Sequence, residues 1–426
     1  MEILHNLPLA PTTLNAQLLQ IYVKLMSRFK ASLDGNPDFS SPYYKVFMPF
    51  CIQNPLLVHI SVYTAACFLN EMKHLDKTVA MLIKGQAIRM LNDRLRSEKD
   101  ATSDEAIAGV CQLIIDEWYW GETQDLRAHL NGMKRMIRLR GGFGNLGLEG
   151  LLSKMVILAD LGIAITFEGP PYLQEGPVFE FRDKNPPLQH AHNTPLIASP
   201  ITFASLAGTY RMHPTTAAIL DDVRFVIALA ISSPTESDQQ KDQKLETTAR
   251  WIHDRIWGLP AVSPETSRQN ESSTRHKAED SGTRQTSTTT QASTSNRSSP
   301  SSVSTEPAPD YVYQSIRLAA LVYTSAIVAR KPFSQSCSVA DFYQVWATVW
   351  RVPLSVWKSM LGIFLWIIVV ITPPSRSTPH ARFVKSMLTI AALVLGIENW
   401  PVSSGALKGM IMLQAKLNRH GTKSMG

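Results

Sequence analysis

The chain has 426 residues, of which 44% are hydrophobic and 8% aromatic, and it carries a formal net charge of +7. This composition is ordinary for a globular protein and supplies ample apolar material for a core, in two or three domains or in one large helical domain. The charge is modest for this length, so it argues neither for nucleic acid nor for an acidic partner.

Four cysteines, Cys51, Cys67, Cys111 and Cys337, are scattered along the chain. No two of them have the spacing of a metal site or of a redox pair, so we expect buried, reduced thiols. The N-terminal residues lack the basic start and the apolar run of a signal peptide. These observations predict a reducing compartment, either the cytoplasm or the nucleus.

The first third of the chain shows the three- and four-residue spacing of amphipathic helices. Asn54 precedes Pro55, which is favoured at the first position of a helix, and Asp76 is a suitable cap for the next one. The apolar stripe expected after Asp76 comprises Val79, Leu82, Ile83, Gln86, Ala87, Met90, Leu91 and Leu95. The predicted helices cover residues 12–33, 55–69, 76–95 and 103–118.

Another helix is predicted between Asp125 and Gly142. Its apolar face repeats at the same spacing, and basic side chains in its last turn suit the negative end of the helix dipole. Gly141 supplies the left-handed residue that ends it. A further amphipathic run covers residues 148–167. Consecutive helices without a strand pattern predict an all-α fold, a multi-helix bundle or array.

The second half begins with an irregular connection, predicted over residues 168–200 from its repeated prolines. Residues 263–309 are rich in Ser and Thr and lack aromatic side chains, so they cannot offset the ~1–2 kcal/mol per residue that ordering costs, and we expect a disordered insertion. Helices are predicted over residues 201–210, 214–231, 241–257, 311–329, 340–350, 354–371, 380–397 and 403–417.

We therefore expect four segments: an N-terminal helix with an irregular stretch (1–53), two parts of one helical domain (54–258 and 311–420), and the linker between those parts (259–310). The most apolar run, Met360–Ile371, is far shorter than the ~20 residues that a bilayer requires. Lys358 precedes it and prolines follow it. The run predicts a buried core helix, and no contact with a membrane is expected.

Motifs that would support an enzyme or a cofactor site are weak in this sequence. Gly142, Gly144 and Gly147 match Gly-x-Gly-x-x-Gly, but they follow a predicted helix instead of a strand. A helix cap and a loop are therefore expected in place of a dinucleotide site. His190 and His192 lie in the proline-rich connection without Cys, Asp or Glu at metal spacing, which favours a solvated loop.

Other titratable residues also favour structural interpretations. His129 lies on or beside the apolar face of the helix over residues 125–142, where we expect a hydrogen-bonded packing histidine. The acidic residues near the preceding helix predict a solvated face: Glu105, Asp116, Glu117 and Glu122. No catalytic, cofactor-binding or metal-binding residue is predicted, and no cofactor.

Two further features leave alternatives open. The basic residues Lys134, Arg135, Arg138 and Arg140 predict an exposed charged face, with a phosphate or an acidic partner as the alternative. Ser263 and Ser299 each precede a proline in the linker. The interpretation there is a passive linker, with proline-directed phosphorylation as the alternative.

The helix over residues 125–142 carries a pattern that resembles the signature of the fungus-specific transcription factor domain: His129-Leu130-x-Gly132-Met133-x-x-Met136-Ile137-x-x-Arg140-Gly141-Gly142. That domain is the helical regulatory region usually found behind a binuclear zinc-cluster DNA-binding module. Asp160 and Ala164 resemble part of the family's next helix, and the resemblance extends over roughly residues 55–415.

A second stretch resembles a late part of the same domain: Pro353-Leu354-x-x-Trp357-Lys358-x-Met360-x-Gly362-Ile363-Phe364-Leu365-Trp366. Leu361 stands where the family pattern has proline, so a straighter helix is expected at this point. The family's zinc cluster needs six cysteines in two Cys-x-x-Cys groups, and the four scattered cysteines of this sequence cannot form it.

The resemblance implies the regulatory region of a nuclear transcription regulator, with direct DNA binding doubtful in the absence of a zinc cluster. It implies protein partners or a homodimer, allows a small-molecule effector, and suggests a nutrient or secondary-metabolite pathway as the context. The alternative is a helical ligand-binding or scaffold protein without a transcriptional role. An enzyme is not expected.

Overall fold

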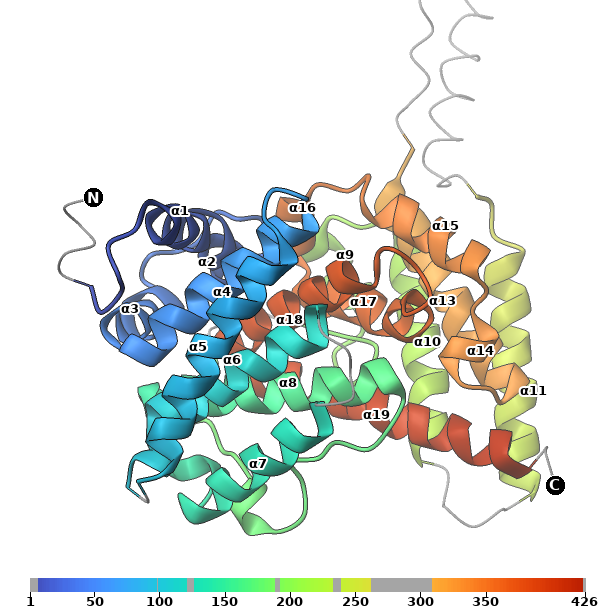
Figure 1. The fold of residues 1–426 in the computed structure, drawn as a ribbon. Coiled ribbons are helices and arrows are strands. Elements are labelled where there is room, and N and C mark those ends of the chain that lie inside the picture. The colour runs from blue at the N-terminus through green and yellow to red at the C-terminus, as the bar shows by residue number, and fades with distance from the viewer. Residues whose placement is uncertain are drawn as a thin grey trace, which may run out of the picture.

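The computed structural model of the chain describes residues 7–97, 99–120, 126–187, 192–232, 239–261 and 309–423. Within these ranges the regular secondary structure is helical and contains no strand, which confirms the predicted all-α fold (Figure 1). Residues 262–308, which hold nearly all of the predicted disordered insertion together with Ser263 and Ser299, lie outside the described residues.

Most helices before residue 262 lie close to their predicted positions, but residues 48–53, expected to be irregular, form an additional short helix. Asn54 and Asp76 accept hydrogen bonds from the backbone amides of Leu56 and Thr78, as expected of N-caps. The predicted helix over residues 12–33 consists of two α-helices joined by a π-helical turn at Tyr22–Met26. The bounds are α1 Thr13–Ile21, α2 Ser27–Ala31, α3 Met48–Gln53, α4 Pro55–Glu71, α5 Lys77–Leu95, α6 Asp104–Trp120, α7 Leu126–Leu139, α8 Leu151–Phe167, α9 Phe203–Tyr210, α10 Pro214–Ser232 and α11 Gln239–Trp257.

The helices after residue 308 pack directly against this first set. α13 contacts α10 and α11, while α17, α18 and α19 all contact α8. Every residue of α17 is buried, so the apolar run in it is a core helix, as predicted. The bounds are α13 Tyr311–Ala329, α14 Phe333–Ser336, α15 Val339–Val349, α16 Leu354–Ser359, α17 Leu361–Ser375, α18 Ala381–Glu398 and α19 Trp400–Lys423.

Two described helical segments, Leu148–Phe167 and Tyr311–Ala329, are long and apolar enough to cross a membrane by length and composition alone. The bent pair Tyr43–Gln53 and Pro55–Glu71 would count as a third such segment. In the fold, 83% and 61% of the apolar windows of the first two are buried inside the protein. Their apolar surface is used for contacts between helices.

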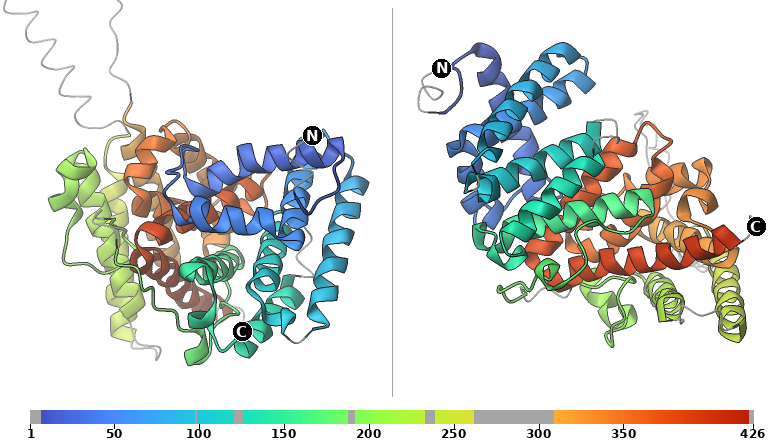
Figure 2. Two further views of the ribbon diagram at one scale, coloured as in Figure 1. Left: turned by 90° about the vertical axis from the view of Figure 1, so that its left-hand side faces the viewer. Right: turned by 60° about the horizontal axis from the view of Figure 1, so that its bottom comes forward.

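The outer position of α5 makes its apolar stripe narrower than predicted. α5 lies at the edge of the molecule and packs mainly on α4 (Figure 2). Ala80, Ala87 and Leu91 are buried, whereas Leu82 is 69% exposed. The prediction that Leu82 belongs to the buried face is wrong, because a helix with one main neighbour covers only a narrow face.

The predicted helix over residues 354–371 is broken at Met360, which has φ −134° and ψ 47° and separates α16 from α17. The expectation of a straighter helix at Leu361 is therefore wrong. Gly362 follows the break and lies against the backbone carbonyl of Asn193, and a Cβ atom at this position would collide with that carbonyl. The break places the start of α17 on a distant loop, a constraint that comes from tertiary packing.

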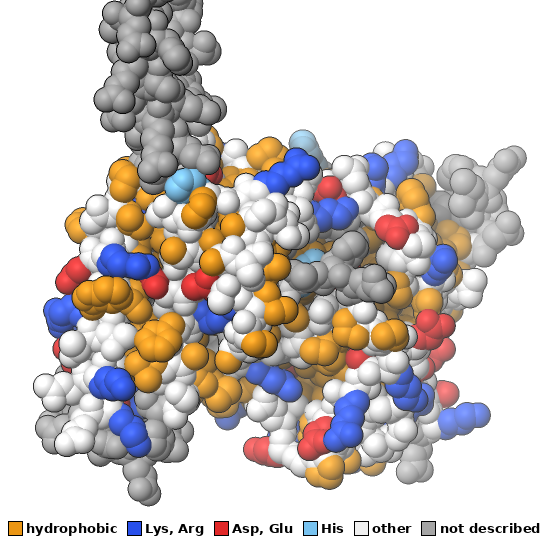
Figure 3. Space-filling model, turned by 180° about the vertical axis from the view of Figure 1, so that it is seen from behind, with side chains coloured by type: hydrophobic (Ala, Val, Ile, Leu, Met, Phe, Trp, Pro, Cys, Tyr) orange, Lys and Arg blue, Asp and Glu red, His pale blue; other side chains and the backbone are white. Residues whose placement is uncertain are grey.

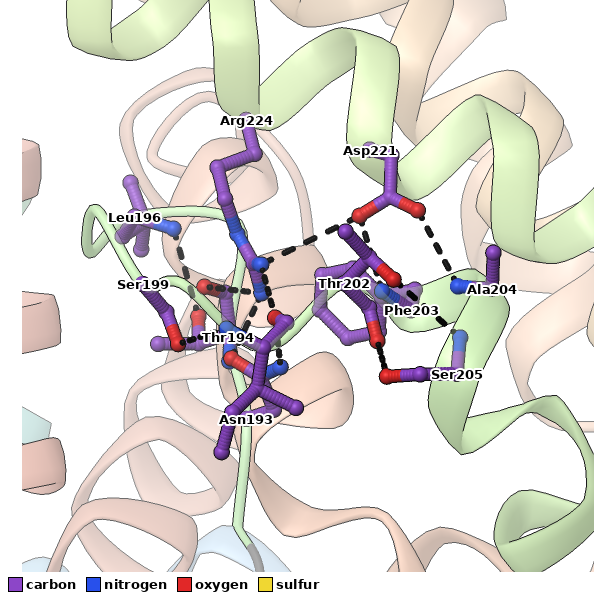
Figure 4. A network of polar contacts seen from close by, with 11 residues as sticks. Asn193, Thr194, Leu196, Ser199, Thr202, Phe203, Ala204, Ser205, Asp221 and Arg224 are labelled. Carbon is purple, nitrogen blue, oxygen red and sulfur yellow. Dashed lines mark hydrogen bonds and ion pairs between the residues drawn. The ribbon is translucent and has the colours of Figure 1, made fainter.

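The predicted irregular connection between α8 and α9 is held on its C-terminal side by Arg224 of α10 (Figure 4). The guanidinium donates to the carbonyl of Ile201 at 2.7 Å, to Oδ1 of Asn193 at 2.5 Å and to the carbonyl of Thr194 at 3.4 Å. It also lies 4.2 Å from the centroid of the Phe203 ring. One buried cation therefore fixes three points of the connection.

The same loop is enclosed by glycines of two C-terminal helices. Gly362 of α17 faces the carbonyl of Asn193, and Gly409 of α19 faces the carbonyl of Leu196. A side chain at either glycine would overlap the loop backbone, so only glycine permits this approach. The loop is thereby locked between α10 on one side and α17 and α19 on the other.

Candidate functional site: a cavity between α2, α6 and α18

A cavity of about 370 Å³ lies where the N-terminal helices meet α6, α8 and α18. Its volume falls in the ~300–1,000 Å³ range of small-molecule sites. Most of its lining side chains are apolar, among them Phe29, Met155 and Met387. Leu25 and Phe383 line it and are each 37% exposed, so they mark its open side.

Helix periodicity explains how α6 and α18 present their lining residues. α6 contributes Gln112, Ile115 and Tyr119, which are separated by three and four positions. Residues at this spacing share one helix face. The lining residues of α18 follow the same rule: Arg382, Phe383, Ser386, Met387, Thr389, Ile390 and Leu393. The cavity is thus formed by two regular helix faces and closed by the segment around α2.

A chain of polar contacts runs from the cavity wall into the core. Lys30 Nζ lies 3.4 Å from Gln112 Oε1, and Gln112 Nε2 donates to Thr64 Oγ1 at 3.2 Å. Thr64 Oγ1 in turn donates to Asp116 Oδ2 at 2.9 Å. The Lys30 ammonium also lies 5.3 Å from the centroid of the Tyr22 ring. Among the described residues, Lys30 forms no ion pair.

Burial controls the ionisation of the groups behind this wall. Desolvation raises the pKa of Asp116 to about 7, although the charge of Lys30 and the hydrogen bond from Thr64 oppose that rise. Desolvation also raises the pKa of Tyr119, whose hydroxyl hydrogen-bonds with Thr389 and Ser386 of α18. Both groups are therefore largely uncharged at slightly acidic pH, and the wall stays weakly polar.

The second cation of the cavity, Arg382, is already neutralised. Its guanidinium forms an ion pair with Glu71 and lies 5.8 Å from the centroid of the Trp120 ring. Trp120 Nε1 donates to the same Glu71 carboxylate at 3.0 Å. No described residue that lines the cavity is a histidine, a cysteine or a carboxylate. The arrangement is suited to binding a molecule and contains no nucleophile with a general base.

The acidic residues around α6 are not the solvated face that was predicted. Asp116 and Glu117 are 1% and 4% exposed. Asp116 is held by Thr64, and Glu117 forms an ion pair with Lys84 of α5. Buried carboxylates need such partners, and these come from other helices, which the sequence pattern of α6 does not reveal. Glu105 is half-buried, and Glu122 lies outside the described residues.

Three of the four basic residues in and just after α7 contact other parts of the chain. Lys134 forms an ion pair with Glu175 at 3.0 Å, and Arg138 lies 5.5 Å from the centroid of the Phe179 ring. Arg140 donates to the carbonyl of Thr102 and to Asp104, each at 3.1 Å. Arg135 is exposed and His129 is half-buried. Arg140 is thus a structural residue that ties α7 to the start of α6.

The glycines after α7 form a cap and a loop, as predicted. Gly141 and Gly142 have φ values of +87° and +105°, and the Gly142 amide donates to the carbonyl of Ile137 at 2.9 Å. Short helical turns at Phe143–Asn145 and Leu148–Gly150 follow. The Gly147 amide donates to Asp104 at 3.1 Å. The backbone amide that a phosphate would use at Gly147 is therefore already bonded.

The histidine pair of the connection is only partly described, since His190 lies outside the described residues. His192 Nε2 lies 2.6 Å from Glu398 Oε2, and the His192 side chain is 7% exposed. The prediction of a solvated histidine is therefore wrong for His192, which pairs with the last residue of α18. Among the residues that the structure describes, no group of three or more His, Cys, Asp or Glu side chains is arranged to hold a metal ion.

The four cysteines are buried free thiols, as predicted. Burial raises the pKa of each thiol to about 12. A thiol with so high a pKa is almost entirely protonated at neutral pH and is a poor nucleophile. The cysteines therefore serve as small apolar core residues.

Sequence reasoning missed the cavity and its polar residues Lys30, Gln112 and Arg382. One signal was available: Gln112 is an uncharged polar residue within the apolar run of α6, and it is 5% exposed. A buried amide requires partners, and its partners here are Thr64 and Lys30. The rest of the wall comes from helices far apart in the sequence, so no local pattern reveals it.

Comparison with known proteins gives one result for this chain. A family model described as the fungal specific transcription factor domain matches residues 17–339. No curated protein and no solved structure matches the chain. The match begins earlier than the resemblance over residues 55–415 implied, and it ends before the stretch over residues 353–366. It includes α7 and the cavity residues from Leu25 to Leu158.

Proposed function

Because the chain belongs to the fungal specific transcription factor domain family, we propose that it regulates transcription in the nucleus and that a small molecule in the cavity between α2, α6 and α18 controls this activity. The match over residues 17–339 is the observation that carries the proposal. A secondary-metabolite pathway as the context of this regulation stays a prediction from the sequence resemblance.

The position of the cavity supports control by a ligand. Its walls come from α2, α6 and α8 in the first half of the chain and from α18 in the second half. A molecule that binds only when these helices are assembled stabilises that assembly by mass action. It thereby shifts the population towards the arrangement in which the N-terminal helices are docked on α18.

A promoter-tethering experiment tests the proposal. The full chain is fused to an unrelated DNA-binding module, and transcription of a reporter and the location of the untethered chain in its native cells are measured. The proposal expects nuclear accumulation and a reporter level that differs clearly from that of the module alone. A cytoplasmic chain that is inert when tethered would instead support the alternative, a ligand-binding or scaffold protein without a transcriptional role.

The outer faces of α10 and α11 support contact with a second protein, which we propose to be another copy of this chain. Phe225 is 59% exposed and Trp251 is 60% exposed. Asp222 and Arg255 form an ion pair between these consecutive helices. Phe225 lies one turn after Asp222, and Trp251 lies one turn before Arg255, so each aromatic side chain lies about one helical turn from this ion pair on its own helix. Large exposed aromatic side chains are typical of protein interfaces.

The face of the molecule that Figure 3 shows carries no single strongly charged patch. There, basic and acidic side chains alternate with scattered apolar ones. Such a mixed surface favours association through a few aromatic anchors over association through long-range charge attraction.

Replacing Phe225 and Trp251 together with serine is expected to weaken self-association at least about tenfold, because both apolar anchors are lost. Sedimentation equilibrium of the purified full chain measures the change. The matched control is Leu82→Ser on α5, which removes a side chain that is 69% exposed and lies away from α10 and α11. A double variant with unchanged association, or a parent chain that is monomeric at high concentration, would contradict the dimer.

A further inference from the structure

We propose that the cavity between α2, α6 and α18 binds an amphipathic monoanion, an apolar chain or ring system that ends in one carboxylate and places this carboxylate on Lys30. This inference deepens the proposed function, since it names the chemical class of the effector. The binding itself does not depend on any transcriptional role.

The contacts of Lys30 include no direct carboxylate partner among the described residues. Its ammonium contacts the neutral amide oxygen of Gln112 at 3.4 Å and lies above the ring of Tyr22, and it forms no ion pair with a described residue. Asp116 is separated from it by Gln112 and Thr64 in the polar chain. An ammonium in an apolar wall gains most from an anion that enters the cavity.

The other charged side chain of the lining does not compete for this anion. Arg382 is paired with Glu71 and lies 5.8 Å from the centroid of the Trp120 ring, so its charge is already balanced. The lining contains no carboxylate among the described residues. A cationic ligand would therefore be repelled by the Lys30 ammonium and would find no carboxylate in the lining to pair with. The cavity is thus suited to a ligand that carries one negative charge and not two.

The remaining walls determine the size and the apolar character of the rest of the ligand. Phe29, Phe68, Ile115, Met155 and Ile390 provide apolar surface around a volume of about 370 Å³. Burying an apolar body there is favourable because it removes apolar surface from water. The cavity opens beside Leu25 and Phe383, which gives a long molecule a route of entry. An apolar chain with a terminal carboxylate matches both the walls and the charge.

Titration calorimetry with three probes of equal chain length tests the inference on the purified full chain: decanoate, decanol and decylamine, each below its micelle concentration. The expected result is that decanoate binds about tenfold or more tightly than decanol, the gain of one charge-assisted contact, and that decylamine binds more weakly still. Equal binding of decanoate and decanol, or no binding of either, would overturn the inference.

Variants of the cavity locate the contact. In Lys30→Gln the advantage of decanoate over decanol is expected to disappear while decanol binding remains, and in Lys30→Arg the advantage is expected to persist. Lys24→Gln is the matched control, because Lys24 lies on the same helical segment and is exposed. Leu25→Trp is expected to weaken the binding of both decanoate and decanol, because the larger side chain narrows the open side of the cavity. Decanoate binding that is unchanged in Lys30→Gln, in a variant that melts like the parent, would reject the assigned site.

The two proposals fail in different ways. If decanoate binds through Lys30 but the tethered chain is inert, the transcriptional role is wrong and the ligand class stands. If the tethered chain is active but decanoate shows no Lys30-dependent binding, the ligand class is wrong and the transcriptional role stands. Addition of decanoate to the reporter cells then measures whether the two are coupled.

Discussion

Replacing Arg224 with methionine is expected to lower the free energy of unfolding by about 3 kcal/mol, because the loss of a buried cation removes three charge-assisted hydrogen bonds from the loop. Three acceptors are affected, the carbonyls of Ile201 and Thr194 and Oδ1 of Asn193. Methionine keeps most of the apolar stem, so the measured loss reports the guanidinium contacts. Denaturant titration followed by circular dichroism provides the unfolding free energy.

The matched control is Arg250→Met on α11. Arg250 is 59% exposed and pairs with Glu246 one turn earlier, a contact expected to contribute below about 1 kcal/mol. In the Arg224 variant we also expect proteolysis to begin within residues 192–202, since the loop loses its clamp. A loss of less than about 1 kcal/mol in Arg224→Met, or a similar loss in both variants, would show that the glycine contacts alone hold the loop.

Replacing Asp116 with asparagine is expected to stabilise the protein at alkaline pH by several kcal/mol relative to the parent, while the difference stays small at pH 4. The folded-state pKa is raised to about 7 by burial, whereas an unfolded aspartate titrates near ~3.9. Between these pH values only the unfolded chain gains the free energy of ionisation. Stability of the parent therefore falls as pH rises from about 4 to about 7 and then levels off.

At ~1.36 kcal/mol per pKa unit, the full effect is on the order of 4 kcal/mol. The groups that face Asp116 are Thr64, Gln112, Lys30 and Glu117, and they are unchanged in the variant. Chemical unfolding of both proteins from pH 4 to pH 9 measures the difference, in which the other titrating groups cancel. Asp93→Asn on exposed α5 is the charge-matched control. A difference that is independent of pH would mean that Asp116 is already ionised at pH 4.

Most of the helix positions could be predicted from the sequence because they depend on local information. The stops at Gly141 and Gly142 and the caps at Asn54 and Asp76 follow from backbone chemistry that acts over a few residues. The break at Met360 could not be predicted, since its reason is the approach of Gly362 to a loop more than a hundred residues earlier. The width of a buried stripe, as on α5, also depends on how many neighbours a helix acquires.

The candidate site was largely hidden for the same reason. The interpretation of Asp116 and Glu117 as a solvated face rested on their charge, and the residues that allow their burial, Thr64 and Lys84, lie on α4 and α5. The cavity wall joins Lys30 to α18, segments that are separated by most of the chain. What the sequence does contain is the family pattern on α7, which identifies a class of regulator through packing residues and says nothing about a ligand.

The packing of α8 has a consequence for synthesis of the chain. α8 is apolar around nearly its whole circumference, and much of its cover is provided by α17, α18 and α19. A nascent chain that has emerged only as far as α11 exposes this surface, together with the uncovered loop over residues 193–197. Such exposed apolar surface attracts chaperones and promotes aggregation. The core around α8 is therefore completed only once α17, α18 and α19 have been synthesised, and no cut between α11 and α13 separates the protein into two independent folding units.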